Sequence, residues 1–383
     1  MAPRQQREVT VTDNFAAILA GPRRALQVSA VDYPEPSDRE IVVRTHAVAV
    51  NPVDWMIQGA GNVLYPWVKY PFVIGTDVAG EVVQVGARVT RFSVGDRVVA
   101  LAVGTDRDVN RSSQGAFQQY TVVREGLASP IPATVPYANA AVLPLGISTA
   151  ACALFQSNQL ALNPPTLNPL PAGKTLLVWG GSSSVGSNAI QLAVAAGYDV
   201  IATASPRNFD YVTSLGARTV VDHSSPTVVD ELVAALQGVT LAGALAVTVG
   251  SAANCAAVLR RCRGRKFISM TTGAVAFDQL TSGKSALTQL PALIGRLVPR
   301  TTALLISCAL SGIRTRFVIG TSLKNDNVGT MIFRDFLPQA LHAGTYRAAP
   351  DPMIVGDGLE HIQEALEIHK NGMSAAKVVV TLP

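Results

Sequence analysis

Short runs of hydrophobic residues recur between residues 174 and 270, separated by segments with apolar residues at helical spacing. The first run, residues 175–179, is apolar without alternation, which is typical of a strand buried on both faces. Regular alternation of strands and helices predicts a parallel sheet with helices on both faces. The expected strands of this α/β unit are residues 175–179, 200–204, 219–222, 244–249 and 266–270.

The chain before this unit has a different pattern. Residues 9–130 carry short β-type runs with Gly, Pro and Asp between them, which predicts a β-rich unit. Residues 139–154 are expected to be helical, and a proline-rich connector follows at 162–171. The expected strands of the β-rich unit are residues 16–19, 40–44, 80–85 and 96–100.

The last third of the chain is less regular. Residues 271–315 are apolar with scattered basic residues, and their less regular pattern predicts no particular element. Further on, the pattern predicts two more strands, at 316–320 and 377–381, and two helices, at 327–342 and 359–371.

The composition suits a two-domain protein with a large core. Hydrophobic residues make up 48% of the 383 residues, and charged residues only 15%. The net charge of +5, without a dense basic run, argues against a nucleic-acid partner and fits small anions such as phosphorylated cofactors. The four cysteines form no C-x-x-C pair, so we expect a reducing, cytoplasmic location without a disulfide framework.

No membrane partner is expected either. The N-terminus lacks the apolar stretch of a signal peptide. The longest apolar run, residues 138–155, is broken by Pro144 and Gly146. This run is therefore predicted to be a buried turn and helix and not a membrane span.

A glycine-serine turn follows the strand at 175–179 and leads into a helical segment, which is the context of a dinucleotide-binding turn. The start of such a helix offers unpaired N–H groups and a positive dipole end to a pyrophosphate. Ser183 stands where the middle glycine of the motif is expected, and its hydroxyl is a potential phosphate donor. A plain strand-to-helix turn is the alternative. The predicted cofactor residues here are Gly181, Ser182, Ser183, Ser184, Val185 and Gly186.

The end of the next strand indicates which cofactor is bound. An NAD-binding fold places an acidic residue there to bind the ribose 2′-hydroxyl. This chain instead has donors suited to a 2′-phosphate, so NADP(H) is predicted; a polar loop with an exposed arginine is the alternative. The residues are Ser205, Pro206, Arg207 and Asn208.

Several motifs in order resemble the medium-chain dehydrogenase/reductase superfamily. They are Asn51-Pro-Val-Asp54 and residues 71–82, 92–98, 115–120, 143–149 and 374–378. The chain is most similar to zinc-free members, namely quinone oxidoreductases and the trans-acting enoyl reductases of fungal polyketide pathways. The resemblance implies a GroES-like catalytic domain built from residues 1–138 and 322–383, around a Rossmann domain at 139–321. Cofactor and substrate would lie in the cleft between them.

The resemblance also implies roles for individual residues. The nicotinamide side would be lined by Asn51, Pro52, Val53 and Asp54. Ser374 and Ala375 would lie near the cofactor, and His223 against the adenosine phosphate, although a surface-loop histidine is the alternative reading. The substrate cleft would be lined by Pro144, Leu145, Gly146, Ile147, Ser148 and Thr149.

Zinc is not expected. Zinc-dependent members carry a cysteine near Asn51 and a histidine where this chain has Thr76. Asp77 alone cannot hold a tetrahedral zinc, and His46 is expected to be a strand residue. One further departure is Met56, where close relatives often have a lysine. The role of that lysine would pass to Tyr65, Thr149, Lys324 or water, so no catalytic residue is assigned.

These features predict a zinc-independent, NADPH-dependent reductase of an activated C=C bond in polyketide or other secondary metabolism. An enone, an enoyl thioester or a quinone would be the substrate, a small apolar molecule either free or bound to a carrier protein. The protein would be a monomer or a homodimer. Residues 274–309 would border the substrate cleft or form a subunit interface. The alternative is a family member that binds NADP(H) but has a non-redox role, as an isomerase, cyclase or scaffold.

Overall fold

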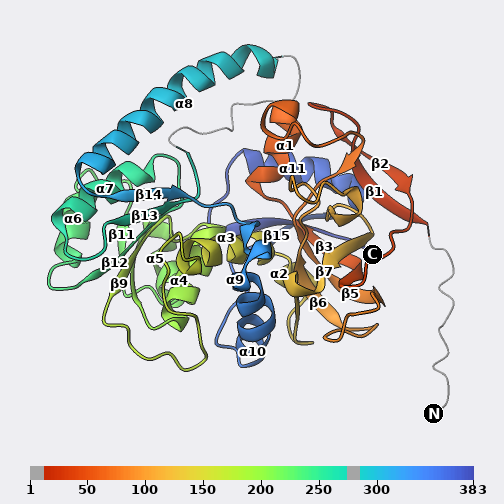
Figure 1. Cartoon of the computed structure of the whole chain (residues 1–383), viewed down its shortest axis with the longest axis horizontal. Coiled ribbons are helices and arrows are strands. Elements are labelled where there is room, and N and C mark those ends of the chain that lie inside the picture. Colours follow the sequence, from red (N-terminus) through yellow and green to blue (C-terminus); the bar gives the residue numbers. More distant parts are fainter. Residues whose placement is uncertain (1–12, 274–284) are drawn as a thin grey trace.

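The computed structural model describes residues 13–273 and 285–383 and contains two sheet-based units side by side (Figure 1). One is built on a six-stranded sheet in the order β11-β10-β9-β12-β13-β14, in which every neighbouring pair is parallel. The predicted parallel sheet is thereby confirmed. Its strands are β9 (Thr175–Trp179), β10 (Asp199–Ala204), β11 (Thr219–Asp222), β12 (Leu241–Ala246), β13 (Phe267–Met270) and β14 (Arg314–Phe317).

The central strand β9 shows why this sheet is covered on both faces. All five of its residues are buried. Leu176 and Val178 point into one hydrophobic core, whereas Leu177 and Trp179 point into another. The helices of this unit are α4 (Ser184–Ala195), α5 (Phe209–Ser214), α6 (Val228–Ala235), α7 (Ser251–Arg261) and α8 (Ser285–Leu310).

The other unit is β-rich, as predicted. Its larger sheet has the order β15-β16-β3-β5-β6-β8, with β7 also paired to β3. Its strands are β3 (Glu40–Ala49), β5 (Asp77–Val85), β6 (Arg97–Leu101), β7 (Tyr120–Arg124), β8 (Ala128–Pro130), β15 (Asp351–Asp357) and β16 (Ala376–Thr381). A smaller sheet contains β1 (Asn14–Leu19), β2 (Leu26–Val31) and β4 (Phe72–Val73).

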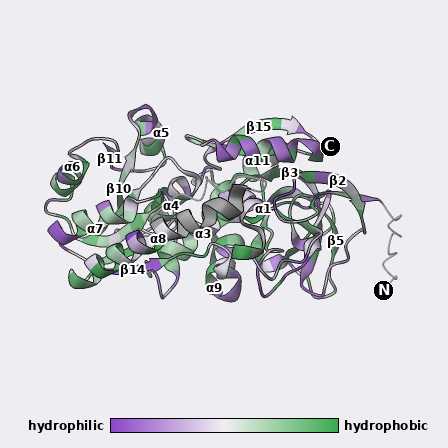
Figure 2. Cartoon of the chain, turned by 90° about the horizontal axis from the view of Figure 1, so that it is seen from above, coloured by the Kyte–Doolittle hydropathy of each residue, from purple (hydrophilic) through white to green (hydrophobic). Residues whose placement is uncertain are grey.

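Both ends of the chain contribute to the larger sheet. β16 pairs antiparallel with β3, so that Val379 lies opposite Ala49. The helices of this unit are α1 (Pro52–Leu64) and α11 (Ile362–Lys370), which pack on each other. In Figure 2, α11 shows a largely hydrophilic ribbon, while its residues Ile362 and Leu366 are buried in the β-rich core. The domain boundaries themselves stay a prediction.

A run of short helical segments joins the two units. α2 (Tyr137–Ala140) and α3 (Pro144–Phe155) form the predicted buried turn and helix. Residues Tyr137–Phe155 are long and apolar enough to cross a membrane, but 78% of the run is buried inside the fold, as in a core helix. Nearer the C-terminus lie α9 (Asn327–Thr330), the π-helical segment η5 (Met331–Phe336) and α10 (Leu337–His342), over the predicted helix at 327–342.

The structure differs from the predicted elements in one helix and in several strand boundaries. Residues 285–310, for which no element was predicted, form the 26-residue helix α8, which contacts α7 and β14 (Figure 1). Pro291, Gly295 and Pro299 usually interrupt helices and conceal its pattern in the sequence. β12 and β14 begin three and two residues earlier than expected (241 against 244, 314 against 316). In β12, an irregularity between Leu241 and Gly243 extends the pairing towards the N-terminus. Residues 274–284 of the segment 274–309 lie outside the described residues, so its role stays a prediction.

The two units share one continuous core. A single cluster of buried residues contains Ala49 of β3, Leu176 of β9 and Ile147 of α3. Helix α3 packs closely on α4 at Gly146, where an added Cβ would lie 2.5 Å from Ser184 Oγ and 3.0 Å from Asn188 Nδ2. The spacing of α3 and α4 therefore depends on a glycine at position 146.

We expect Gly146→Ala to lower the free energy of unfolding by about 1–3 kcal/mol, because a tightly packed contact must open. Gly126→Ala is the control, since a Cβ there meets nothing within 4 Å. Chemical denaturation of both variants measures the difference, and equal stabilities would contradict this account of the α3–α4 contact.

Candidate cofactor and substrate site

The predicted dinucleotide turn connects β9 to α4. Ser183 is the N-cap of α4: its Oγ donates to the carbonyl oxygen of Gly180 (2.7 Å) and accepts from the backbone N–H of Gly186 (3.0 Å). The hydroxyl thus stabilises the helix start. Its predicted role as a phosphate donor would require these bonds to rearrange, and it stays a prediction.

Gly181 and Gly186, the two glycines predicted to bind the cofactor, lie where the turn is tightly packed. A Cβ on Gly186 would collide with the carbonyl oxygen of Gly180, so the strand and the helix can approach only because residue 186 has no side chain. A Cβ on Gly181 would lie 3.0 Å from Ala202 Cβ. The residues between them, Ser182 to Val185, are partly exposed.

One polar atom of this turn has no partner. Ser184 Oγ is buried and makes no hydrogen bond within residues 13–273 and 285–383. It lies in the first turn of α4, where free backbone N–H groups and the helix dipole favour an anion. This hydroxyl faces α3, because a Cβ on Gly146 would lie 2.5 Å from it.

The structure brings together most of the residues predicted to bind the adenosine end. Ser205 Oγ lies 3.1 Å from His223 Nε2, although the ring of His223 is exposed. Asn208 Nδ2 donates to Ser374 Oγ (3.0 Å), which connects η3 (Pro206–Asn208) to the C-terminal segment. Arg207 is exposed beside them. Residues from the ends of β10 and β11 and from residue 374 thus form one polar surface.

The predicted nicotinamide side contains a buried polar cluster, defined as Asn51, Thr76, Asp77 and Lys377. Asn51 Nδ2 donates to Thr76 Oγ1 (2.9 Å) and to Asp77 Oδ2 (2.8 Å). Lys377 Nζ donates to Asn51 Oδ1 and lies 3.1 Å from Asp77 Oδ2. The side chains of Lys377 and Asp77 are 3% and 0% exposed.

The same cluster reaches the predicted substrate residues. The backbone N–H of Leu145, in the first turn of α3, donates to Asp77 Oδ1 (2.7 Å). Sequence reasoning did not assign Asp77 or Lys377 to the site. The motif at 374–378 contained Lys377, but no spacing in the sequence indicates that it meets residue 77.

Asp54 has a structural role at the start of α1. The backbone N–H of Asn51 donates to Asp54 Oδ2 (2.8 Å), completing a capping box. Asp54 is fully buried, and Oδ1 has no partner in the described part of the chain. Burial, with a smaller contribution from the nearby charge of Asp77, raises the pKa of this carboxyl to about 8. Asp54 is therefore largely protonated at neutral pH.

The candidates for the role of the missing lysine lie in different surroundings. Lys324 is held by Asp106 (2.7 Å) and Asp108 (3.1 Å). Tyr65 packs edge-to-face on Trp67, and burial raises the pKa of its hydroxyl to about 12. Thr149 Oγ1 lies directly against Gly320, where a Cβ would collide with it. These contacts do not identify a proton donor.

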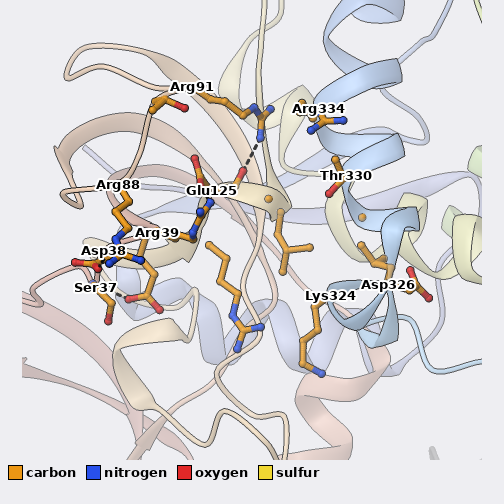
Figure 3. A pocket seen from close by; sticks show the side chains of 17 residues that line it. Ser37, Asp38, Arg39, Arg88, Arg91, Glu125, Lys324, Asp326, Thr330 and Arg334 are labelled. Carbon is orange, nitrogen blue, oxygen red and sulfur yellow. Dashed lines mark hydrogen bonds and ion pairs between the residues drawn. The ribbon is translucent and has the colours of Figure 1, made fainter.

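A separate cavity of about 740 Å³ lies between the β-rich sheet and residues 323–334 (Figure 3). Basic side chains are prominent in it, but ion pairs neutralise several, including Arg88 with Asp38. Arg91 donates to the carbonyl oxygens of Glu125 (2.7 Å) and Phe333 (3.3 Å) and so ties its walls together. None of the predicted cofactor or substrate residues lines this cavity.

Comparison with known proteins gives consistent matches over the whole chain. Residues 37–133 match the alcohol dehydrogenase GroES-like domain. The chain is 49% identical to the dehydrogenase pigH of Monascus ruber, over 93% of this chain and 96% of that protein. It is 40% identical to the trans-enoyl reductase himH of Aspergillus japonicus, over 94% of both. Its fold is similar to the crystal structure of CurK enoyl reductase, with a TM-score of 0.69 and 17% identity, over 97% of this chain and 100% of that one.

The raised pKa of Asp54 predicts a pH-dependent stability. The folded protein holds this proton up to about pH 8, whereas the unfolded chain releases it near 3.8. This contribution to stability is therefore complete below about pH 4 and is lost as the pH rises through 8.

Asp54→Asn keeps a neutral acceptor for the N–H of Asn51 and removes the titration. We expect the unfolding free energy of the wild type, relative to the variant, to fall between pH 5 and 8 by up to about 1.4 kcal/mol per pH unit. Denaturation at several pH values measures this. Parallel curves for the two proteins would contradict it.

Proposed function

The chain belongs to the medium-chain dehydrogenase/reductase superfamily of nicotinamide-dependent oxidoreductases, and on this basis we propose that it is an NADPH-dependent, zinc-independent reductase of activated carbon–carbon double bonds. The substrate class is an enone, enoyl thioester or quinone of secondary metabolism. The names of relatives such as the trans-enoyl reductase himH support this class. The observation that carries the proposal is the polar cluster of Asn51, Thr76, Asp77 and Lys377.

The donor atoms of this cluster do not suit zinc. Asn51 and Thr76 stand at the positions where zinc-dependent members have a cysteine and a histidine, and they supply an amide and a hydroxyl. The single carboxylate, Asp77, is already neutralised by Lys377. Structural and catalytic zinc sites use thiolate, imidazole and carboxylate ligands. Within residues 13–273 and 285–383, no three His, Cys, Asp or Glu side chains are grouped to hold a metal.

The cofactor site fits NADPH. The backbone N–H groups and the dipole at the start of α4 suit the pyrophosphate. At the end of β10, where an acid would repel a 2′-phosphate, the chain has Ser205, Asn208 and the exposed guanidinium of Arg207. Guanidinium groups bind phosphate through charge-assisted hydrogen bonds.

The proposed reaction is a conjugate reduction. A bound NADPH supplies the hydride that the β-carbon of the substrate accepts. Asn51 and the first turn of α1 would border the nicotinamide, and residues 144–149 of α3 would orient the substrate. Donors in the cleft would stabilise the enolate, which takes up a proton at the α-carbon. No Lewis acid is needed for this step, because the double bond is activated by its own carbonyl group.

The test is NADPH consumption with a panel of enones, quinones, free enoyl thioesters and carrier-protein-bound enoyl thioesters. We expect turnover with at least one class, with the saturated product identified by mass. Tight NADPH binding without turnover of any member would instead support the non-redox alternative.

A second expectation concerns the metal. Because the donor set does not suit zinc, the purified enzyme should contain no stoichiometric zinc, and a chelator should leave its NADPH turnover unchanged. Metal analysis of the active protein measures this. About one zinc per chain, together with loss of turnover in chelator, would refute zinc independence.

A third expectation concerns cofactor preference. Arg207→Ala should weaken NADPH binding by roughly 10- to 100-fold, since a charge-assisted hydrogen bond contributes about 1.5–3 kcal/mol. NADH, which lacks the 2′-phosphate, should be much less affected. Arg218→Ala removes another exposed arginine of the same unit, which pairs with Asp199, and is the control. Titration with both cofactors decides the matter; equal losses for NADPH and NADH would mean that Arg207 supports the fold or stacks on the adenine.

A further inference from the structure

Lys377 is a buried cation with a single ionised partner. Its ammonium lies 3.1 Å from Asp77 Oδ2 and donates to Asn51 Oδ1, and its side chain is 3% exposed. Removing an ammonium from water is costly unless an opposite charge and hydrogen bonds compensate for it. A neutral apolar residue at this position would avoid that cost. The presence of a charge therefore indicates that Lys377 holds its neighbours in place.

The partner carboxylate contacts both sides of the proposed cleft. Asp77 Oδ2 accepts from Asn51 Nδ2 (2.8 Å), the residue at the start of α1. Asp77 Oδ1 accepts from the backbone N–H of Leu145 (2.7 Å), in the first turn of α3. Helix α3 in turn packs on α4, the helix of the dinucleotide turn, at Gly146. One charged side chain thus positions the nicotinamide border and the substrate helix relative to each other.

Resting on the proposed function, we infer that Lys377 is a positioning residue for hydride transfer: its ion pair holds Asp77 in place, and Asp77 in turn fixes Asn51 and the start of α3 on either side of the nicotinamide. Hydride transfer is sensitive to such placement, since a displacement of about 1 Å can cost about 100-fold in rate. The residues proposed to hold the phosphates, Ser184 and Arg207, lie outside this cluster. Loss of Lys377 should therefore lower kcat far more than it raises KM for NADPH.

Two variants separate positioning from folding. Lys377→Met leaves Asp77 buried without its cation, so it should lower the melting temperature as well as kcat. Asp77→Asn combined with Lys377→Met leaves no buried charge and should recover much of the melting temperature. Its new amide has one oxygen and cannot accept from both Asn51 Nδ2 and the N–H of Leu145, so the original hydrogen bonds are not restored. Lys174→Met, at an exposed lysine before β9, is the control for loss of a positive charge.

For the double variant, we expect kcat about 10- to 100-fold below wild type, with KM for NADPH within about threefold. Wild-type kcat in the double variant would overturn the inference and make the pair purely structural. Equal changes in kcat and in NADPH affinity would also overturn it, as would failure of both variants to fold. Absence of turnover in the wild-type enzyme is a different result: it would refute the proposed function and the inference that rests on it.

Discussion

A carboxylate with no exposed surface needs a cation beside it. At Asp77, this requirement governs how Asn51, the start of α3 and Lys377 are placed relative to each other. The cation comes from Lys377, far along the chain on strand β16, which pairs with β3. Without Lys377, no opposite charge would offset the cost of burying this carboxylate. With it, both oxygens of Asp77 stay available as acceptors for Asn51 and for the start of α3.

Helix α3 transmits this arrangement to the cofactor-binding unit. Nearly all of its residues are buried, and it belongs to the core that contains strands of both sheets. At Gly146 it approaches α4 so closely that a methyl group would not fit without adjustment. Because interiors are close-packed, a shift at one end of α3 has to be accommodated by its neighbours. The cleft is thus bordered by elements whose separation is set by packing and not by loops.

Two residues that were predicted to bind the cofactor make hydrogen bonds at the start of a helix. Ser183 caps α4 with its hydroxyl, and Asp54 caps α1 as a carboxyl whose pKa burial raises. Helix starts need such acceptors wherever backbone N–H groups lack partners. By contrast, Arg207 is exposed and Ser184 Oγ is buried without a partner in the described residues. Ser184 Oγ also lies at the contact with Gly146 of α3, so this side chain takes part in helix packing.

The pattern of residues along the chain was enough to predict the class of fold and the glycine-serine turn between β9 and α4, because both depend on local signals. An unbroken apolar run marks β9, and a glycine-serine turn before a helical pattern marks the start of α4. Local signals failed where proline and glycine were tolerated inside α8. They could not reveal the pair of Asp77 and Lys377, which forms only when distant parts of the chain come together. The reason is strand pairing: Ala49 of β3 lies opposite Asp77 of β5 on one side and Val379 of β16 on the other, so three distant segments meet at one point.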